Sequence, residues 1–350
     1  MEKKLIHKLQ AEHKLSNYEY EQLLSSFPDE EIISLALMLA NKERERLFKN
    51  TVYIRGLIEI SSICRNNCFY CGIRRDNHKA ERYRLNDEEI ISCCIKGYEL
   101  GFRTFVLQGG EDPALSDEFL IPIIKKIKDE LPECALTLSL GERSYESYKS
   151  LYLAGADRYL LRHETADEEH YNMLHPIQMS FENRIKCLYD LRDIGYQVGC
   201  GFMVGTPGQT KKTLSEDLKF IEEFRPEMCG IGPFIPHHDT PFADIPPGNA
   251  KLTCFLLSLL RLIHPAMMIP STTALATLIP DGRIKGISSG ANVIMPNLTL
   301  DRVRGKYELY NNKAYSGRES AEEVDLFAKE LIKYGYRIII ARGDYGDQIK

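Results

Sequence analysis

The residues with the clearest chemical potential are three cysteines in one short loop, Cys64, Cys68 and Cys71. Their C-x3-C-x2-C spacing directly follows an apolar, strand-like run over 54–60. Three thiolates so close in the chain can bind one metal centre, but a closed iron–sulfur cube or a closed structural zinc site requires a fourth ligand. A cluster held by three cysteines leaves one iron with an open coordination position. The pattern therefore predicts a metal centre at which a further molecule can bind and react.

Two other uses of these cysteines have to be weighed. A structural zinc site would need a fourth ligand, and His78, seven residues after Cys71, could complete a Cys3His set. A disulfide framework is disfavoured, because the ten cysteines are scattered over 350 residues and we expect no signal peptide. Cys93, Cys94 and Cys187 lie in apolar stretches, where free cysteine packs as a small core residue. This usage predicts a reducing, cytoplasmic location.

Composition narrows the class of protein further. Hydrophobic residues make up 43% of the chain and charged residues 27%, which is ordinary for a soluble globular protein. The net charge of −5 gives no sign of a nucleic-acid surface. Spanning a bilayer takes roughly 20 apolar residues, and the longest candidate, 252–263, is interrupted by Arg261. We therefore expect neither a nucleic-acid partner nor a membrane partner.

The elements that must position the cysteines alternate between strand and helix patterns. Short, continuous apolar strands of this kind are typical of a parallel sheet that is buried on both faces. Eight such strands with intervening helices predict an α/β fold of the (βα)8 TIM-type barrel class, with its active site at the carboxyl ends of the strands. An open, doubly wound sheet is the alternative on periodicity alone. The candidate strands are 54–60, 104–108, 135–140, 158–162, 197–204, 228–232, 267–271 and 291–295.

The chain also divides into three parts by pattern. Residues 1–50 are charged and helical, and predict an N-terminal helical extension. Residues 51–310 carry the barrel, and 311–350 a C-terminal helix and extension packed on it. Several helix ends are marked by capping residues: Asn86 begins a capping-box pattern, and Ser180 begins a helix that Gly195 ends.

Polar residues gather directly after several predicted strands, where a barrel places its active site. Gly109-Gly110-Glu111 follows the second strand, and its paired glycines would let the backbone approach a ligand closely. Arg162-His163-Glu164 follows the fourth strand. His237 and His238 follow the sixth, but neighbours on an extended chain point in opposite directions, which disfavours a shared metal ion. Each of these segments alone could be an ordinary loop.

Taken together, these segments resemble the radical S-adenosylmethionine (SAM) superfamily. The cysteine loop matches, with Tyr70 just before its last cysteine, and the Gly109–Pro113 segment resembles the motif that holds the amino group of SAM. Longer strings resemble the HydE family of FeFe-hydrogenase maturases over roughly residues 50–310. They begin at Tyr70, Arg162, Ser180, Gly230 and Gly290, and fall in the family's order. The biotin synthase and methylornithine synthase families are the nearest competitors.

The resemblance implies one 4Fe–4S cluster on Cys64, Cys68 and Cys71, with SAM on the open iron. Because the radical would be generated on SAM, no protein side chain is predicted to be the catalytic group. Glu164 would bind the ribose hydroxyls of SAM and Arg184 its carboxylate, pairings that suit a carboxylate and a guanidinium. The residues implied to bind SAM are Tyr70, Gln108, Gly109, Gly110, Glu111, Thr137, Glu164, Arg184, Met203 and Ile235; those implied to face the substrate are Arg55, Arg162, Thr272, Thr273, Met295, Tyr307 and Tyr310.

The implied reaction is reductive cleavage of SAM to a 5′-deoxyadenosyl radical during assembly of the diiron subcluster of FeFe-hydrogenase. The substrate would be a small, anionic, cysteine-bound organoiron species, and the partners an electron donor and other maturation proteins, with the chain itself a monomer. Some family members carry a second cysteine cluster near the C-terminus, but no cysteine follows Cys254 here, which predicts one cluster.

Two different functions are the alternatives. An amino-acid mutase such as methylornithine synthase, or a biotin-synthase-like enzyme, would keep the radical chemistry and change the substrate. Lysine as a substrate would need a carboxylate partner for its amine, and the residues matched to the cavity are basic and neutral, which disfavours it. A non-enzymatic scaffold or metal carrier would use the same cysteines to store zinc or a cluster.

Overall fold

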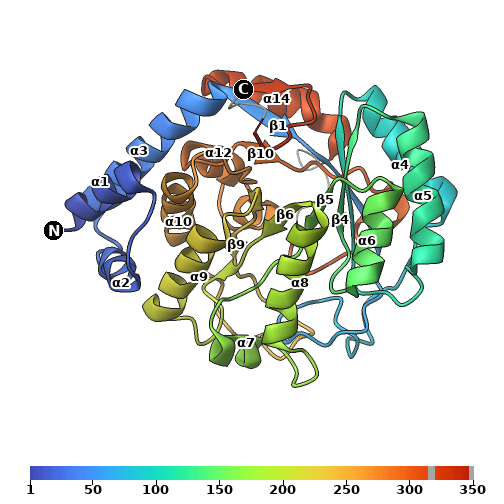
Figure 1. Cartoon of the computed structure of the whole chain (residues 1–350), viewed down its shortest axis with the longest axis horizontal. Helices are drawn as coiled ribbons and strands as arrows, with labels where there is room; N and C mark the ends of the chain where they lie inside the picture. The colour runs from blue at the N-terminus through green and yellow to red at the C-terminus, as the bar shows by residue number, and fades with distance from the viewer. Residues whose placement is uncertain (314–319, 347–350) are drawn as a thin grey trace.

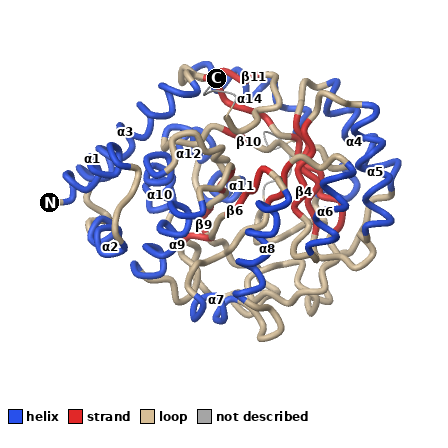
Figure 2. The backbone as a smooth tube through the Cα atoms, viewed as in Figure 1, coloured by secondary structure: helices blue, strands red, loops and turns tan. Residues whose placement is uncertain are grey.

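The computed structural model of the chain describes residues 1–313 and 320–346. Its strands form an inner parallel barrel and its helices an outer layer (Figures 1 and 2). Six strands pair in chain order without a reversal, and every pairing is parallel. They are β2 (Gly56–Ser61), β3 (Thr104–Gly109), β4 (Ala135–Ser139), β5 (Arg158–Leu160), β6 (Gln197–Cys200) and β8 (Met228–Cys229). The predicted α/β barrel class is confirmed.

The remaining wall closes the barrel through shorter pairings. β1 (Thr51–Ile54) runs into β2 and pairs in parallel with β10 (Val293–Ile294) and β11 (Arg337–Ile339). Single parallel bridges, Met228–Met268, Pro270–Val293 and Leu57–Asn297, join the edges. The predicted strand over 267–271 is therefore wrong as a regular strand and contributes only these two bridging residues. Pro270 has no N–H to donate, so the ladder cannot continue through it.

Two other predicted strands are interrupted. The run 54–60 divides at Arg55, where β1 and β2 take different partners. The run 197–204 divides into β6 and β7 (Met203–Val204), and β7 pairs with β9 (Gly232–Pro233). The break falls at Gly201, whose φ is +149° and whose hypothetical Cβ would lie 2.1 Å from the carbonyl oxygen of Gly230. Only glycine fits this close approach.

The outer helices begin and end largely where their capping residues predicted. Asn86 forms a capping box with Glu89 at the start of one helix. At the start of another, the Ser180 side chain accepts a hydrogen bond from the backbone N–H of Asn183, and Gly195 ends that helix with a left-handed backbone conformation. The helices around the barrel are α4 (Asp87–Glu99), α5 (Asp117–Glu130), α6 (Tyr145–Ala154), α7 (Glu168–Leu174), α8 (Phe181–Ile194), α9 (Lys211–Phe224), α10 (Ala250–Ile263), α11 (Thr273–Leu278), α12 (Gly282–Ser288), α13 (Asp301–Arg304) and α14 (Val324–Lys333), the last preceded by a 3₁₀ turn over Ala321–Glu323.

Three helices precede the barrel and lie at one side of it (Figure 1): α1 (Glu2–Glu12), α2 (Asn17–Ser25) and α3 (Glu30–Phe48). α3 packs along the buried α10, and α2 packs against α9. Within the described part of the chain, every helix is too short or too polar to cross a lipid bilayer.

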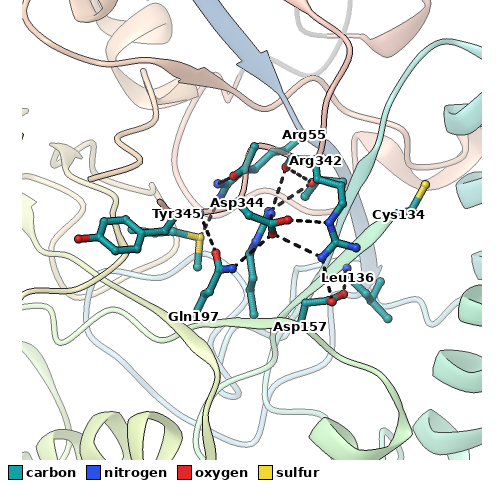
Figure 3. A network of polar contacts seen from close by, with 12 residues as sticks. Arg55, Cys134, Leu136, Asp157, Gln197, Arg342, Asp344 and Tyr345 are labelled. Carbon is teal, nitrogen blue, oxygen red and sulfur yellow. Dashed lines mark hydrogen bonds and ion pairs between the residues drawn. The ribbon is translucent and has the colours of Figure 1, made fainter. Parts of the chain in front are cut away.

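The C-terminal segment after β11 lies across the amino-terminal ends of β3 and β5 (Figure 3). The buried Arg158 guanidinium donates to the carbonyl oxygen of Arg342 at 3.0 Å and to the carboxylate of Asp344 at 2.5 Å. Arg342 binds the same carboxylate at 2.7 Å and Asp157 at 3.1 Å. This charged network closes the end of the barrel opposite to the cysteine loop.

Candidate active site

A cavity of about 370 Å³ lies at the carboxyl ends of the barrel strands. Cys64, Cys68 and Cys71 all line it, from the loop that follows β2. Burial raises the pKa of Cys71 to about 12, and burial together with the two neighbouring thiols raises the pKa of Cys68. Three thiols that hold their protons this firmly need a cation to become thiolates, which a bound iron centre provides.

The loop after β3 packs directly on the cysteine loop. The N–H of Gly110 donates to the carbonyl oxygen of Ser61 at 3.2 Å, and the N–H of Arg65 donates to the carbonyl oxygen of Glu111 at 2.9 Å. A Cβ on Gly110 would lie 2.3 Å from the carbonyl oxygen of Ile63 and 2.7 Å from the Cβ of Cys64. Glycine at this position is what lets the two loops form one wall of the cavity.

The acidic residues of this loop anchor it to its neighbours. One Glu111 oxygen lies 3.0 Å from the Arg65 guanidinium, and the other accepts the backbone N–H of Glu142 at 2.9 Å. Asp112 is buried and bound by Arg84 and Ser61 at 2.7 and 2.6 Å. Both carboxylates therefore hold the loops around the cysteines in position.

Glu164 points into the cavity from a strained backbone position. Its φ is +67°, in the left-handed region that non-glycine residues rarely adopt, and its N–H donates to the carbonyl oxygen of Gly201 at 3.0 Å. The side chain is buried, and its Oε2 atom accepts no hydrogen bond from the described residues, although it forms a long ion pair with the Arg162 Nη2 atom at 3.6 Å. A buried carboxylate oxygen without a hydrogen bond is costly unless a ligand donates to it. The predicted ribose hydroxyls would be such donors.

Two buried residues support Glu164 from behind the strand. The Nδ1 atom of His163 accepts the N–H of Gly201 at 3.2 Å, so its proton is on Nε2, which lies 3.3 Å from Asp217. Asp217 also accepts the N–H of Ala166 at 2.6 Å. These contacts fix the backbone on both sides of Glu164 and hold its carboxylate inward.

Arg184 reaches the same cavity from α8. Its Nε atom donates to Glu142 at 2.5 Å and its Nη1 atom to the carbonyl oxygen of Arg162 at 2.7 Å. The guanidinium is buried and fixed by these two acceptors. It therefore presents a preorganised positive charge, which suits the carboxylate of an amino-acid ligand.

Most of the predicted ligand-binding residues come together in this one cavity. Those that line it are Tyr70, Gln108, Gly109, Gly110, Glu111, Glu164, Arg184, Met203 and Ile235 from the SAM set, and Arg162, Thr272, Thr273, Met295, Tyr307 and Tyr310 from the substrate set. Two atoms of the Arg162 guanidinium and the Thr272 hydroxyl have no hydrogen-bond partner within the described ranges. The substrate side of the cavity thus offers donors to a polar guest.

Two predicted residues lie elsewhere. Thr137 is buried in β4 and is not part of the cavity wall. Arg55 lies at the barrel floor, where its guanidinium contacts the Met228 sulfur at 2.8 Å and the carbonyl oxygen of Gly343 at 3.4 Å (Figure 3). Arg55 is therefore bound at the floor of the barrel and is not part of the cavity wall.

The cavity also contains a pair of residues that sequence reasoning missed, Glu59 and Lys313. The residues matched to the substrate side of the cavity are basic and neutral, and the Glu59 carboxylate adds an acidic group that this matching did not include. One signal was present in the sequence: Glu59 is the single charged residue of an otherwise apolar strand. Nothing in the sequence connected it to Lys313, which follows 254 residues later.

The histidines considered as metal ligands lie outside the cavity wall. His78 is exposed and does not line the cavity with the three cysteines, so a Cys3His site gains no support. His237 and His238 do not point in opposite directions as expected, because the chain turns there; their rings stack with centroids 4.3 Å apart. With Asp239 they form a surface group whose carboxylate already binds Lys79 at 2.7 Å.

Comparison with known proteins identifies relatives of this architecture. Residues 58–221 match the sequence model of the Radical SAM superfamily. The chain is 47% identical over 275 residues to the [FeFe] hydrogenase maturase subunit HydE of Thermotoga maritima, covering 79% of this chain and 78% of that protein. It is 28% identical to a 3-methylornithine synthase of Methanosarcina acetivorans over 82% of this chain and 81% of the relative. A solved methylornithine synthase structure superposes with a TM-score of 0.79 at 24% identity, covering 96% of this chain and 97% of the other, a likeness of fold.

Proposed function

We propose that this chain, which belongs to the radical SAM superfamily and within it to the HydE family, acts in assembly of the diiron subcluster of the FeFe-hydrogenase active site. As a member of this superfamily it is an enzyme that uses a 4Fe–4S cluster and SAM. When bound, the cluster and SAM together supply a 5′-deoxyadenosyl radical by reductive cleavage of the SAM sulfonium.

The residues of the cavity have distinct parts in this scheme. Cys64, Cys68 and Cys71 hold the cluster, and the Gly109–Glu111 backbone lies against their loop. Glu164 accepts hydrogen bonds from the ribose hydroxyls of SAM, and Arg184 pairs with the carboxylate of SAM. The observation that carries the proposal is the convergence in one cavity of the cysteine loop, the buried Glu164 oxygen that accepts no hydrogen bond from the described residues, and the buried Arg184 charge.

The proposed substrate is a small, anionic, cysteine-bound organoiron species. It would bind on the side of the cavity formed by Arg162, Thr272 and Tyr307. The Arg162 Nε atom and the Thr272 hydroxyl, which have no hydrogen-bond partner among the described residues, support a guest that accepts hydrogen bonds, since an apolar guest would leave these buried groups without one. The enclosing barrel keeps water away from a reactive intermediate.

The partners of this reaction follow from the same assignment. Radical generation requires an electron donor, and subcluster assembly requires the other hydrogenase maturation proteins and the hydrogenase itself. We propose that the chain works as a monomer in the cytoplasm. Its ten cysteines are all free, which supports a reducing compartment.

Anaerobic complementation tests this function. A host that carries an FeFe-hydrogenase and its other maturation proteins, but lacks its own HydE, should regain hydrogenase activity when this chain is expressed. The Cys68→Ala variant should not restore it. If cluster-loaded wild-type protein accumulates without restoring activity, the maturation role is refuted. Formation of methylornithine from lysine would then support the mutase alternative.

A further inference from the structure

Glu59 is a fully buried carboxylate in the wall of the active-site cavity, in the middle of the apolar strand β2. The Asn297 side chain donates to its Oε2 atom at 3.0 Å. Its backbone is also held, since its N–H donates to the Thr299 hydroxyl at 2.8 Å and its carbonyl oxygen accepts from Tyr83 at 2.7 Å. A carboxylate fixed and desolvated in this way requires a positive partner.

Lys313 supplies that partner from the segment after α13. Its ammonium pairs with the Oε1 atom of Glu59 and donates to the carbonyl oxygen of Tyr307 at 2.8 Å. It also lies 4.7 Å from the centre of the Tyr307 ring, over the ring face. The side chain is 7% exposed. The carboxylate, the carbonyl group and the aromatic face together form a recognition site for a primary ammonium group.

This ammonium site faces the substrate side of the cavity. Glu59, Lys313, Tyr307 and Tyr310 all line the same cavity as the three cysteines. A substrate that binds through a primary ammonium group would need a carboxylate in the cavity. In this chain Glu59 provides the carboxylate, and the ammonium group of Lys313 is already paired with it.

We propose that Lys313 is a specificity-determining residue: its ammonium fills the amine-binding position offered by Glu59, so that this position is closed to a substrate that would bind there through a free primary ammonium group. The site then admits neutral or anionic guests. The meaning of this selection for catalysis depends on the function proposed above, but the occupancy of the site by Lys313 does not.

Chemical complementation tests the proposal. The Lys313→Ala substitution removes three methylenes and an ammonium group, which n-propylammonium replaces atom for atom. In the cluster-loaded protein, calorimetry should show n-propylammonium binding to Lys313→Ala at least tenfold more tightly than to the wild type. Tetramethylammonium, which has no N–H donor, should show no such gain. The matched control is Lys306→Ala, because Lys306 belongs to the same segment but forms an exposed ion pair with Glu81.

A double variant decides whether Glu59 is the receptor. Glu59→Gln combined with Lys313→Ala should lose the tenfold gain. Equal n-propylammonium affinity in the wild type and a folded Lys313→Ala variant overturns the proposal, and so does an undiminished gain in the double variant.

A second variant keeps the proposal testable if Lys313→Ala does not fold. Glu59→Ala removes the carboxymethyl group and leaves the Lys313 ammonium without its carboxylate, so acetate, which replaces that group atom for atom, should bind at least threefold more tightly than to the wild type. Unchanged acetate affinity contradicts the proposal. Formation of 5′-deoxyadenosine by the wild type is scored separately, so failure of the proposed reaction remains distinguishable from failure of the amine-site assignment.

Discussion

At the residue scale, the predicted ligand site contains buried polar atoms that have no hydrogen-bond partner in the described protein. The Oε2 atom of Glu164, two nitrogens of Arg162 and the Thr272 hydroxyl are buried and lack hydrogen-bond partners in the described part of the chain. Proteins rarely leave such atoms unpaired without a reason. The backbone strain at Glu164 agrees with this, since a left-handed glutamate is retained only where its surroundings force it.

Replacing Glu164 by glutamine should weaken SAM binding. A hydrogen bond to a charged group contributes about 1.5–3 kcal/mol, so we expect SAM affinity to fall roughly 10- to 100-fold. Equilibrium dialysis with the cluster-loaded protein measures this. Glu168→Gln, an exposed residue at the start of α7, is the control and should bind SAM as the wild type does. Unchanged affinity in the Glu164 variant would remove this residue from the SAM site.

The residues of the site differ in how far the sequence could predict them. The cysteines and Glu164 belong to short local motifs, so their positions could be read directly. The Glu59–Lys313 pair could not, because its members are 254 residues apart and each is unremarkable in its own segment. Arg55 is a related case: the sequence does not indicate that the C-terminal segment returns to contact it at the barrel floor.

At the scale of elements, the site is formed by loops that pack without intervening side chains. The Gly109–Glu111 loop and the cysteine loop touch through their backbones, and Gly110 has no room for a side chain. The strand ends were predictable from apolar runs, since each run stops at the polar loop it positions. The breaks at Gly201 and Pro270 were not, because they arise from a close backbone approach and a missing donor in the assembled sheet.

The Gly110→Ala substitution should displace the cysteine loop. The added methyl would meet the carbonyl oxygen of Ile63 and the Cβ of Cys64 at distances that atoms do not reach, so the loop must shift. We expect the iron content after anaerobic reconstitution to fall severalfold while the far-ultraviolet circular dichroism is retained. Gly230→Ala provides the comparison, because its φ lies outside the left-handed region and a Cβ there would only touch Pro270 at 3.6 Å. Full iron content in Gly110→Ala would contradict the packing argument.

The network at the barrel floor should make stability depend on acid pH. Burial acts to raise the pKa of Asp344, but hydrogen bonds and charge from Arg342 and Arg158 outweigh it and lower the pKa to about 2. A lowered carboxyl pKa stabilises the fold above the unfolded value and loses this contribution as pH falls through the folded one. Asp344 thus contributes about 2 kcal/mol at neutral pH, which disappears between about pH 4 and pH 2.

Urea unfolding of the cluster-free protein measures this contribution. Asp344→Asn should lower the free energy of unfolding by about 2 kcal/mol at pH 6, and by about half as much at pH 3. Asp325→Asn, on the exposed face of α14, should change little at either pH. A gap between wild type and Asp344→Asn that stays constant with pH would show that the carboxylate charge is not responsible.

At the scale of the whole molecule, the two ends of the barrel differ: a network of charged residues closes one end, and the predicted active site lies at the other. The floor network of Arg158, Arg342 and Asp344 closes one end (Figure 3), and the cavity with the cysteines lies at the other. The barrel class followed from the alternation of strands and helices. Its exact closure, through single bridges at Met268 and Pro270, depends on long-range packing that periodicity does not encode.

Ligand binding at the open end should stabilise the entire barrel. A ligand at a hundred times its dissociation constant stabilises a folded protein by about 2.7 kcal/mol. For SAM and the cluster-loaded protein this corresponds to a rise in the thermal midpoint of roughly 3–6 °C. Anaerobic calorimetry measures the midpoint, and Glu164→Gln at the same SAM concentration should show a smaller rise. No rise in the wild type would contradict a SAM site in this cavity.

The most direct test of the account is the yield of 5′-deoxyadenosine from SAM and a strong reductant under anaerobic conditions. The wild type should form it, and Cys68→Ala should form at least a hundredfold less, because the cluster loses one of its three protein ligands. Cys94→Ala, which removes a buried thiol in α4 far from this loop in the chain, should retain the activity. Formation by Cys68→Ala at the wild-type rate would contradict the assignment of this loop as the radical-generating centre.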